Sequence, residues 1–198
     1  MTQKRSQLQI QKTVLAEKND VLGHNHLALI KELTDSSNFS WFYYSDIHRA
    51  KPEERQEWNI ARHGFVHQLW FEDQQSSPYF NLFEPIVYKM ADTAGVKYER
   101  LLRMQVNMML NVGKEINGTE HTDGFAIYET KDLKWFSGCY YINDSDGYTT
   151  IHLPDAGVKH VEPVADSLVV FDGNLKHSAQ LPLVHNRRVL VNINFLGS

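Results

Sequence analysis

The pattern of apolar and polar positions changes near residue 100 of this 198-residue chain. Before that point, apolar side chains recur every three or four positions in residues 19–33 and 78–95, which predicts two amphipathic helices. Pro85 lies inside the second segment, and we expect it to kink or split that helix. The aromatic stretch NFSWFYYSDIH between the helices could form an early strand.

After residue 100, short apolar segments alternate with turn-forming residues, as is typical of β-strands. The expected strands are 101–111, 120–129, 135–142, 148–153, 158–162, 167–172, 176–182 and 187–196. Short strands that follow a helical first half predict a mainly β fold, a sandwich or barrel with supporting helices. We expect one domain, with a mostly helical support region at 1–100 and the β fold at 101–196.

Composition and charge argue against several classes of partner. The formal net charge is −4, and the basic residues are not gathered into a stripe, so nucleic acid is not an expected partner. No segment approaches the roughly 18 apolar residues of a membrane span. Cys139 is the single cysteine, which rules out an intramolecular disulfide. These features predict a cytoplasmic protein that binds no membrane.

The stretch EHTDGFAIYE, residues 120–129, holds His121 and Asp123 one residue apart. In a strand, side chains at positions i and i+2 point to the same face, so these two groups could share a metal ion. His177 opens a late strand that could return beside an earlier one and supply a third ligand. Two histidines and one carboxylate leave three octahedral positions open, which is what Fe(II) needs to bind a bidentate cosubstrate and O₂.

The other histidines are weaker candidates for metal ligands. His63 and His67 have the i, i+4 spacing of a zinc pair on a helix, but HGFVH lacks the glutamate of the HExxH motif. Gly64 also disfavours a helix there. His24 and His26 would point about 200° apart on a helix, which is unsuitable for one shared ion.

The last predicted strand, HNRRVLVNINF, carries a second polar feature. Arg188, Asn192 and Asn194 share one face of the strand, and the opposite face is largely apolar. A guanidinium pairs with a carboxylate through two parallel hydrogen bonds, so Arg188 is the candidate to bind a small dicarboxylate. A one-residue shift in strand register would exchange it with Arg187, which remains the alternative.

Taken together, these motifs resemble those of a known family. The stretches HTD, GCYYINDSDGYTT, VEPVADSLVVFDG, HSAQLP and RRVLVNINF have the order and approximate spacing of the 2-oxoglutarate- and Fe(II)-dependent dioxygenases. These motifs look most like those of small prolyl-4-hydroxylase-like members of the family from marine phages and bacteria. The resemblance covers residues 101–196 and implies a double-stranded β-helix, or jelly roll, with helices on one sheet. DGYTT departs from the Gly-Gly pair of many relatives, which changes the expected turn but not the site.

The resemblance also implies a set of metal ligands and a set of cosubstrate-binding residues. The Fe(II) ligands would be His121, Asp123 and His177, and the residues toward 2-oxoglutarate would be Arg188, Tyr141 and Asn107. Tyr140 and Tyr141 alternate along one strand, so only one of them can face inward, and we favour Tyr141.

The implied activity is hydroxylation of an unactivated C–H bond by O₂, with conversion of 2-oxoglutarate into succinate and CO₂ and with ascorbate as an accessory reductant. The branch favours a peptide or protein side chain such as proline as the substrate, and a small molecule is the main alternative. We expect lid loops at 46–63 and 111–120. No feature of the sequence indicates the oligomeric state.

Two other classes of protein could contain a similar metal site. A cupin-type metal-binding protein usually offers HxH and a glutamate, so the aspartate at position 123 argues against it. A jelly roll that has lost catalysis could act as an interaction module. Release of succinate from 2-oxoglutarate would distinguish the oxygenase from both.

Overall fold

A computed structural model describes residues 15–45, 47, 63–154 and 157–198. Most of its strands form one large antiparallel sheet in the order β1-β9-β6-β11-β5-β3-β2, with β4 paired to β3. These strands are β1 (Leu15–Lys18), β2 (Phe42–Tyr44), β3 (Gly64–Phe71), β4 (Gln74–Gln75), β5 (Tyr98–Leu110), β6 (Lys134–Tyr141), β9 (Ser167–Asp172) and β11 (Arg187–Gly197).

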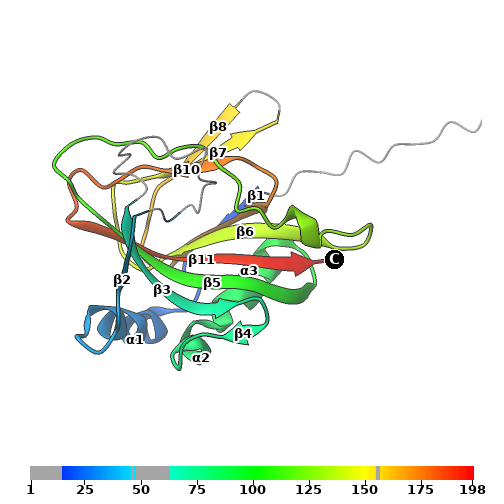
Figure 1. The fold of residues 1–198 in the computed structure, drawn as a ribbon, viewed down its shortest axis with the longest axis horizontal. Coiled ribbons are helices and arrows are strands. Elements are labelled where there is room, and N and C mark those ends of the chain that lie inside the picture. The colour runs from blue at the N-terminus through cyan, green and yellow to red at the C-terminus, as the bar shows by residue number, and fades with distance from the viewer. Residues whose placement is uncertain (1–14, 46, 48–62, 155–156) are drawn as a thin grey trace, which may run out of the picture.

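A smaller antiparallel sheet has the strand order β10-β7-β8. Its strands are β7 (Thr149–Leu153), β8 (Gly157–Val161) and β10 (His177–Ala179). The helices are α1 (His24–Asp35), α2 (Phe80–Phe83), α3 (Pro85–Ala94) and the 3₁₀ helix η3 (Ala126–Tyr128). Figure 1 shows α1, α2 and α3 on one side of the large sheet and the small sheet on the other.

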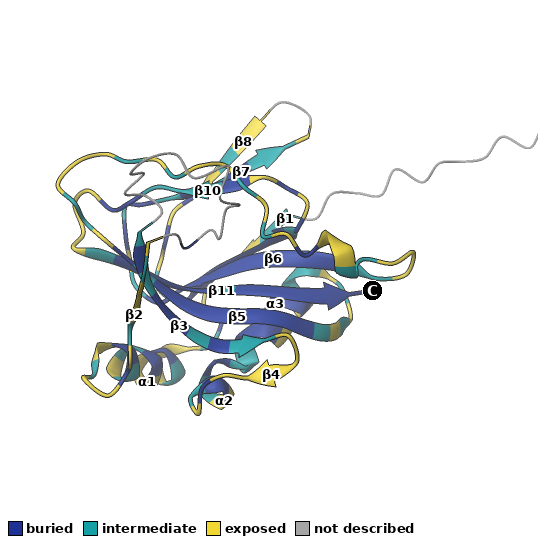
Figure 2. Ribbon diagram, viewed as in Figure 1, coloured by how far each residue is buried: buried dark blue, intermediate teal, exposed yellow. Residues whose placement is uncertain are grey.

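The central strands of the large sheet are buried on both faces because each face packs against a different layer. Helical residues such as Ile30 and Met90 form one core cluster with Val191 and Ile193 of β11. On the opposite face, Leu190 of β11 packs in a second cluster that also contains Ile151 of the small sheet. Figure 2 shows β5, β6 and β11 buried along most of their length, as this packing on both faces requires.

Several sequence predictions about local structure are confirmed. Residues 19–33 contain most of α1, and Pro85 separates α2 from α3 by occupying the first turn of α3, where its missing N–H costs no hydrogen bond. Gly95 ends α3 in the left-handed conformation, at φ 69°. The predicted strands at 101–111, 135–142, 148–153, 158–162, 167–172 and 187–196 correspond to β5, β6, β7, β8, β9 and β11.

Other predictions need correction. Residues 120–129 form no continuous strand; they contain an isolated bridge at His121 and the 3₁₀ helix η3. The first hundred residues contribute strands as well as helices, among them β3, which begins at Gly64 within HGFVH. The strand expected at 176–182 is limited to β10. The lid loop predicted at 46–63 lies almost entirely outside the described residues.

Within the described part of the chain, no helix combines the length and the apolar character needed to cross a membrane.

Candidate metal centre

His121 and His177 are brought together by backbone pairing between two distant segments. The amide of His121 donates to the carbonyl of His177 at 3.0 Å, and the amide of His177 donates to the carbonyl of His121 at 2.9 Å. This isolated antiparallel bridge places the two imidazole centroids 4.5 Å apart. Asp123 follows two residues later, and Gly124, at φ 82°, then turns the chain.

The three predicted ligands form one cluster. One nitrogen or oxygen atom from each of His121, Asp123 and His177 lies within 4.8 Å of the corresponding atoms of the other two. The Nδ1 atoms of the two histidines lie 3.0 Å and 3.2 Å from the backbone carbonyls of Thr119 and Leu175. These two contacts fix the orientation of the rings, as outer hydrogen bonds do for metal-binding histidines, and leave the Nε2 atom of each ring directed away from the backbone.

The protonation states of the cluster suit a divalent metal ion. Burial lowers the pKa of His177 to about 4, so its imidazole is neutral near pH 7, the form that binds metals. Burial would raise the pKa of Asp123, but the charge of Arg103, the two imidazoles and a hydrogen bond from Ser137 together hold that pKa well below its usual range. The donor set is therefore a carboxylate and two imidazoles, which fits first-row divalent ions such as Fe(II).

The carboxylate of Asp123 is held by three side chains that the sequence reasoning did not assign to the site. Arg103 Nη2 donates to Oδ1 at 2.6 Å, and Asn194 Nδ2 and Ser137 Oγ donate to Oδ2. The sequence did carry a signal for Arg103, since it alternates with Gln105 and Asn107 along the predicted strand at 101–111. The structure shows that all three side chains are buried. A polar row of this kind indicates an interior face that meets a polar ligand.

A cavity between the two sheets connects this cluster to Arg188. The cavity lining also includes Gln105, Asn107, Cys139, Thr149 and Asn192. Asn107, the predicted pocket residue, therefore lies in the wall of the cavity. It accepts a hydrogen bond from Gln105 Nε2 at 2.9 Å.

Arg188 lies in this wall as a buried cation with incomplete hydrogen bonding. Only 1% of its surface is exposed, Nη2 donates to Thr149 Oγ1, and Nη1 lies 3.6 Å from the sulfur of Met109. Its Nε is buried and has no hydrogen-bond partner, and no described carboxylate forms an ion pair with it. A buried charge without a counter-ion is costly, so a ligand carboxylate is the group that this position lacks.

Strand parity separates the two alternatives that the sequence left open. Arg187 points outward and pairs with the partly exposed Asp35 at 2.6 Å, so it lies away from the cavity. Tyr141 faces inward: the guanidinium of Arg188 lies 5.6 Å from its ring centroid, and its hydroxyl donates to Thr149 at 2.7 Å. Tyr140 faces the helix layer and donates to Asp166 at 2.8 Å.

Two of the other histidine candidates, His67 and His26, have structural contacts in the described chain. His67 is buried in β3, with Nδ1 2.7 Å from the carbonyl of Ser40 and Nε2 2.8 Å from Ser77 Oγ. His26 Nε2 lies 2.7 Å from the carbonyl of Leu82. Neither belongs to a group of metal-binding side chains among the described residues.

No family model matches this sequence, and no curated protein matches it. Solved structures do match its fold. A 2OG-Fe(II) oxygenase family oxidoreductase from Burkholderia pseudomallei aligns with a TM-score of 0.64 at 16% identity, over 92% of this chain and 84% of that chain. The chain has the fold of these oxygenases. The double-stranded β-helix predicted from the sequence is therefore confirmed.

Two further structures show how varied the proteins with this fold are. The non-heme alpha ketoglutarate dependent epimerase SnoN from nogalamycin biosynthesis aligns with a TM-score of 0.65 at 14% identity, over 92% of this chain and 77% of that chain. A prolyl hydroxylase from Trichoplax adhaerens, solved with a peptide fragment of the hypoxia inducible factor oxygen degradation domain, aligns with a TM-score of 0.56 at 13% identity, over 91% of this chain and 83% of that chain.

Proposed function

We propose that this chain is a 2-oxoglutarate-dependent Fe(II) oxygenase that hydroxylates an unactivated C–H bond. The observation that carries the proposal is the combination, in one cavity, of a His-Asp-His cluster and a buried arginine that has no carboxylate partner among the described residues. A metal site alone would fit many binding proteins. The arginine adds a place for the distal carboxylate of a dicarboxylic cosubstrate.

Each residue of the cavity has a defined part in this proposal. His121, Asp123 and His177 hold the metal, and Arg103, Ser137 and Asn194 orient the carboxylate of Asp123. Arg188 and Thr149 bind the distal carboxylate of 2-oxoglutarate, and the ring of Tyr141 supports the guanidinium. Asn107 lies in the adjoining wall. When bound, Fe(II) and O₂ supply the oxidising chemistry that converts 2-oxoglutarate into succinate and CO₂.

The substrate that we propose is a peptide or protein side chain such as proline. Support comes from the resemblance of the sequence motifs to those of prolyl-4-hydroxylase-like proteins. It also comes from the structurally similar prolyl hydroxylase from Trichoplax adhaerens, which was solved with a peptide fragment. SnoN has the same fold and is described as an epimerase, so the fold by itself does not select peptides. A small-molecule substrate remains the alternative.

The proposal is tested by adding Fe(II) and 2-oxoglutarate to the protein without oxygen. We expect a visible metal-to-ligand charge-transfer band, because 2-oxoglutarate can chelate iron only if the protein leaves two adjacent positions open. Absence of the band in folded protein would contradict the proposal. Admission of O₂, with and without ascorbate, should then yield succinate; a band without succinate, even with prolyl peptides present, would favour the inactive jelly roll.

A further inference from the structure

Arg103 presents hydrogen-bond donors to the cavity beyond those that hold Asp123. The residue is only 6% exposed, and its Nε donates to Asn194 Oδ1 at 2.9 Å. Its Nη2 donates to Asp123 Oδ1 at 2.6 Å and to Asn192 Oδ1 at 2.9 Å. Its Nη1 hydrogen-bonds to no described residue, although the side chain lines the cavity.

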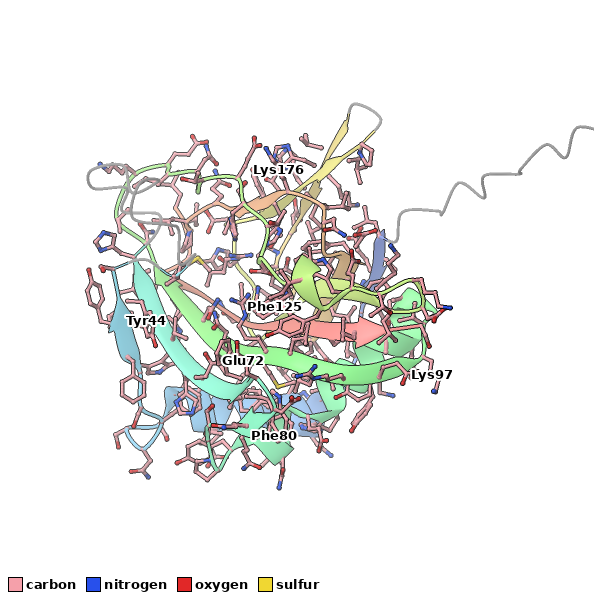
Figure 3. The ribbon with its side chains drawn as sticks, turned by 45° about the vertical axis from the view of Figure 1, so that its right-hand side comes forward. Tyr44, Glu72, Phe80, Lys97, Phe125 and Lys176 are labelled. Atoms are coloured by element: carbon pink, nitrogen blue, oxygen red, sulfur yellow. The ribbon has the colours of Figure 1, made fainter. Side chains whose placement is uncertain are left out.

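Two neighbours fix the direction of these donors. The guanidinium carbon lies 5.2 Å from the ring centroid of Phe125, which packs against Trp135; Figure 3 shows Phe125 in front of the large sheet. Arginine can only donate, so Asn192 must turn its oxygen toward Arg103 and its Nδ2 away from it. Asn192 also lines the cavity, and its Nδ2 has no partner among the described side chains.

The charges around the cavity leave one positive charge without a counter-ion. The charged residues of the described lining are Arg103, Arg188 and Asp123, which give a formal charge of +1 when the imidazoles are neutral. Fe(II) and doubly ionised 2-oxoglutarate together add no charge. In the loaded site the carboxylate of Asp123 is shared between the metal and Arg103, so the excess positive charge lies beside Arg103. A buried cation is stabilised by an anion that it can bind directly.

We infer that Arg103 Nη1 and Asn192 Nδ2 bind a carboxylate of the primary substrate, next to the metal ligand Asp123. The inference rests on the proposed function and specifies its substrate class. The carboxylate could be the α-carboxylate of a free amino acid or an acidic side chain beside the modified residue of a peptide. Both sources offer two oxygens to two donors that come from the neighbouring strands β5 and β11.

The test uses the protein loaded anaerobically with Fe(II) and 2-oxoglutarate, so that the cosubstrate occupies Arg188. Matched probes are added that differ in one carboxylate: L-proline against L-prolinamide, and prolyl peptides with Asp against Asn beside the proline. Binding is followed by the change in the charge-transfer band. We expect at least one acid to bind about 30-fold or more tightly than its amide, as for a buried charged hydrogen-bonded pair.

Two variants assign this preference to the proposed donors. Arg103→Gln should weaken the preference for the acid, and its Fe(II) and 2-oxoglutarate affinities are measured separately because Arg103 also holds the metal ligand Asp123. Asn192→Ala should weaken the preference with the Arg103–Asp123 pair left in place and with the affinity for 2-oxoglutarate unchanged. The second variant keeps the test valid if the first fails to fold. Arg100→Gln is the matched control, because Arg100 lies on the same strand and its charge pairs with the exposed Asp73.

The outcomes separate this inference from the proposed function. If the band never forms, the proposed function fails and the inference falls with it. If the band forms but every acid binds no better than its amide, or no probe binds, the inference alone is overturned. Loss of 2-oxoglutarate affinity in Asn192→Ala would also overturn it, because this donor would then serve the cosubstrate.

Discussion

At the scale of single residues, Arg187 and Arg188 are adjacent in sequence but lie on opposite faces of β11. Arg188→Ala should reduce the affinity for 2-oxoglutarate by roughly 30-fold to several thousand-fold, because the distal carboxylate would be buried without its charged partner. Arg187→Ala removes only the surface pair with Asp35 and should change this affinity by less than about threefold. Titration of the charge-transfer band measures both. A large loss in Arg187→Ala alone would refute the assignment.

Asp123 is also best tested by two substitutions, because it is both a candidate ligand and the partner of a buried arginine. Asp123→Asn keeps a hydrogen-bond acceptor for Arg103. It should lower the affinity for Fe(II) by at least about 100-fold, because substitution of a residue that only supports a metal ligand costs up to about that factor and loss of a ligand should cost more. Asp123→Ala should lose metal binding and also about 3–5 kcal/mol of stability, because Arg103 is left buried and unpaired. Metal titration and urea unfolding separate the two effects. Unchanged iron affinity in Asp123→Asn would mean that another carboxylate binds the metal.

At the scale of elements, Asp146 stabilises the segment that leads into β11. Its carboxylate accepts hydrogen bonds from the backbone N–H groups of Leu183, Val184 and His185. Partial burial would raise the pKa of Asp146, but these hydrogen bonds outweigh it and hold the pKa well below its usual range. The ionised carboxylate therefore stabilises the fold above the unfolded pKa of about 3.9, and this contribution is lost as the pH falls toward the folded pKa.

Asp146→Asn should consequently be less stable than the parent protein at pH 7, and the difference between their free energies of unfolding should become smaller below about pH 4. Urea unfolding at several pH values measures this dependence. Asp132→Asn is the matched control, since Asp132 is exposed and its ion pair with the exposed Lys131 is long, at 3.8 Å. A stability difference that does not depend on pH would show that the ionised form of Asp146 contributes nothing.

At the scale of the whole molecule, the cavity joins the two sheets, so ligands bound there should stabilise the entire fold. Fe(II) with 2-oxoglutarate at about 100 times its dissociation constant should add roughly 2.7 kcal/mol. For a chain of this size, that free energy corresponds to a rise in Tm of about 5–10 °C. Thermal unfolding under anaerobic conditions measures the shift, and Arg188→Ala should reduce the part that depends on 2-oxoglutarate. No shift in the parent protein would contradict a shared binding cavity.

The sequence by itself determined the elements that depend on local chemistry. Pro85 and Gly95 mark the ends of α3 because each restricts or permits particular backbone angles within one turn. The alternation along β11 put Arg188 and Arg187 on opposite faces, since the side-chain period of a strand is two wherever the strand pairs. The HTD and RRVLVNINF motifs likewise identified the predicted fold without any coordinates.

Only the tertiary structure decided what depends on contacts between distant segments. His121 and Asp123 converge through a bridge to His177 and a turn at Gly124, not through the strand that their spacing suggested. Arg103 joins the site because β5 pairs with β11, which brings it against Asn192 and Asn194 some ninety residues away. Periodicity reports which face a side chain occupies, but not what lies across from it, because the partner of each face is set by strand order and register.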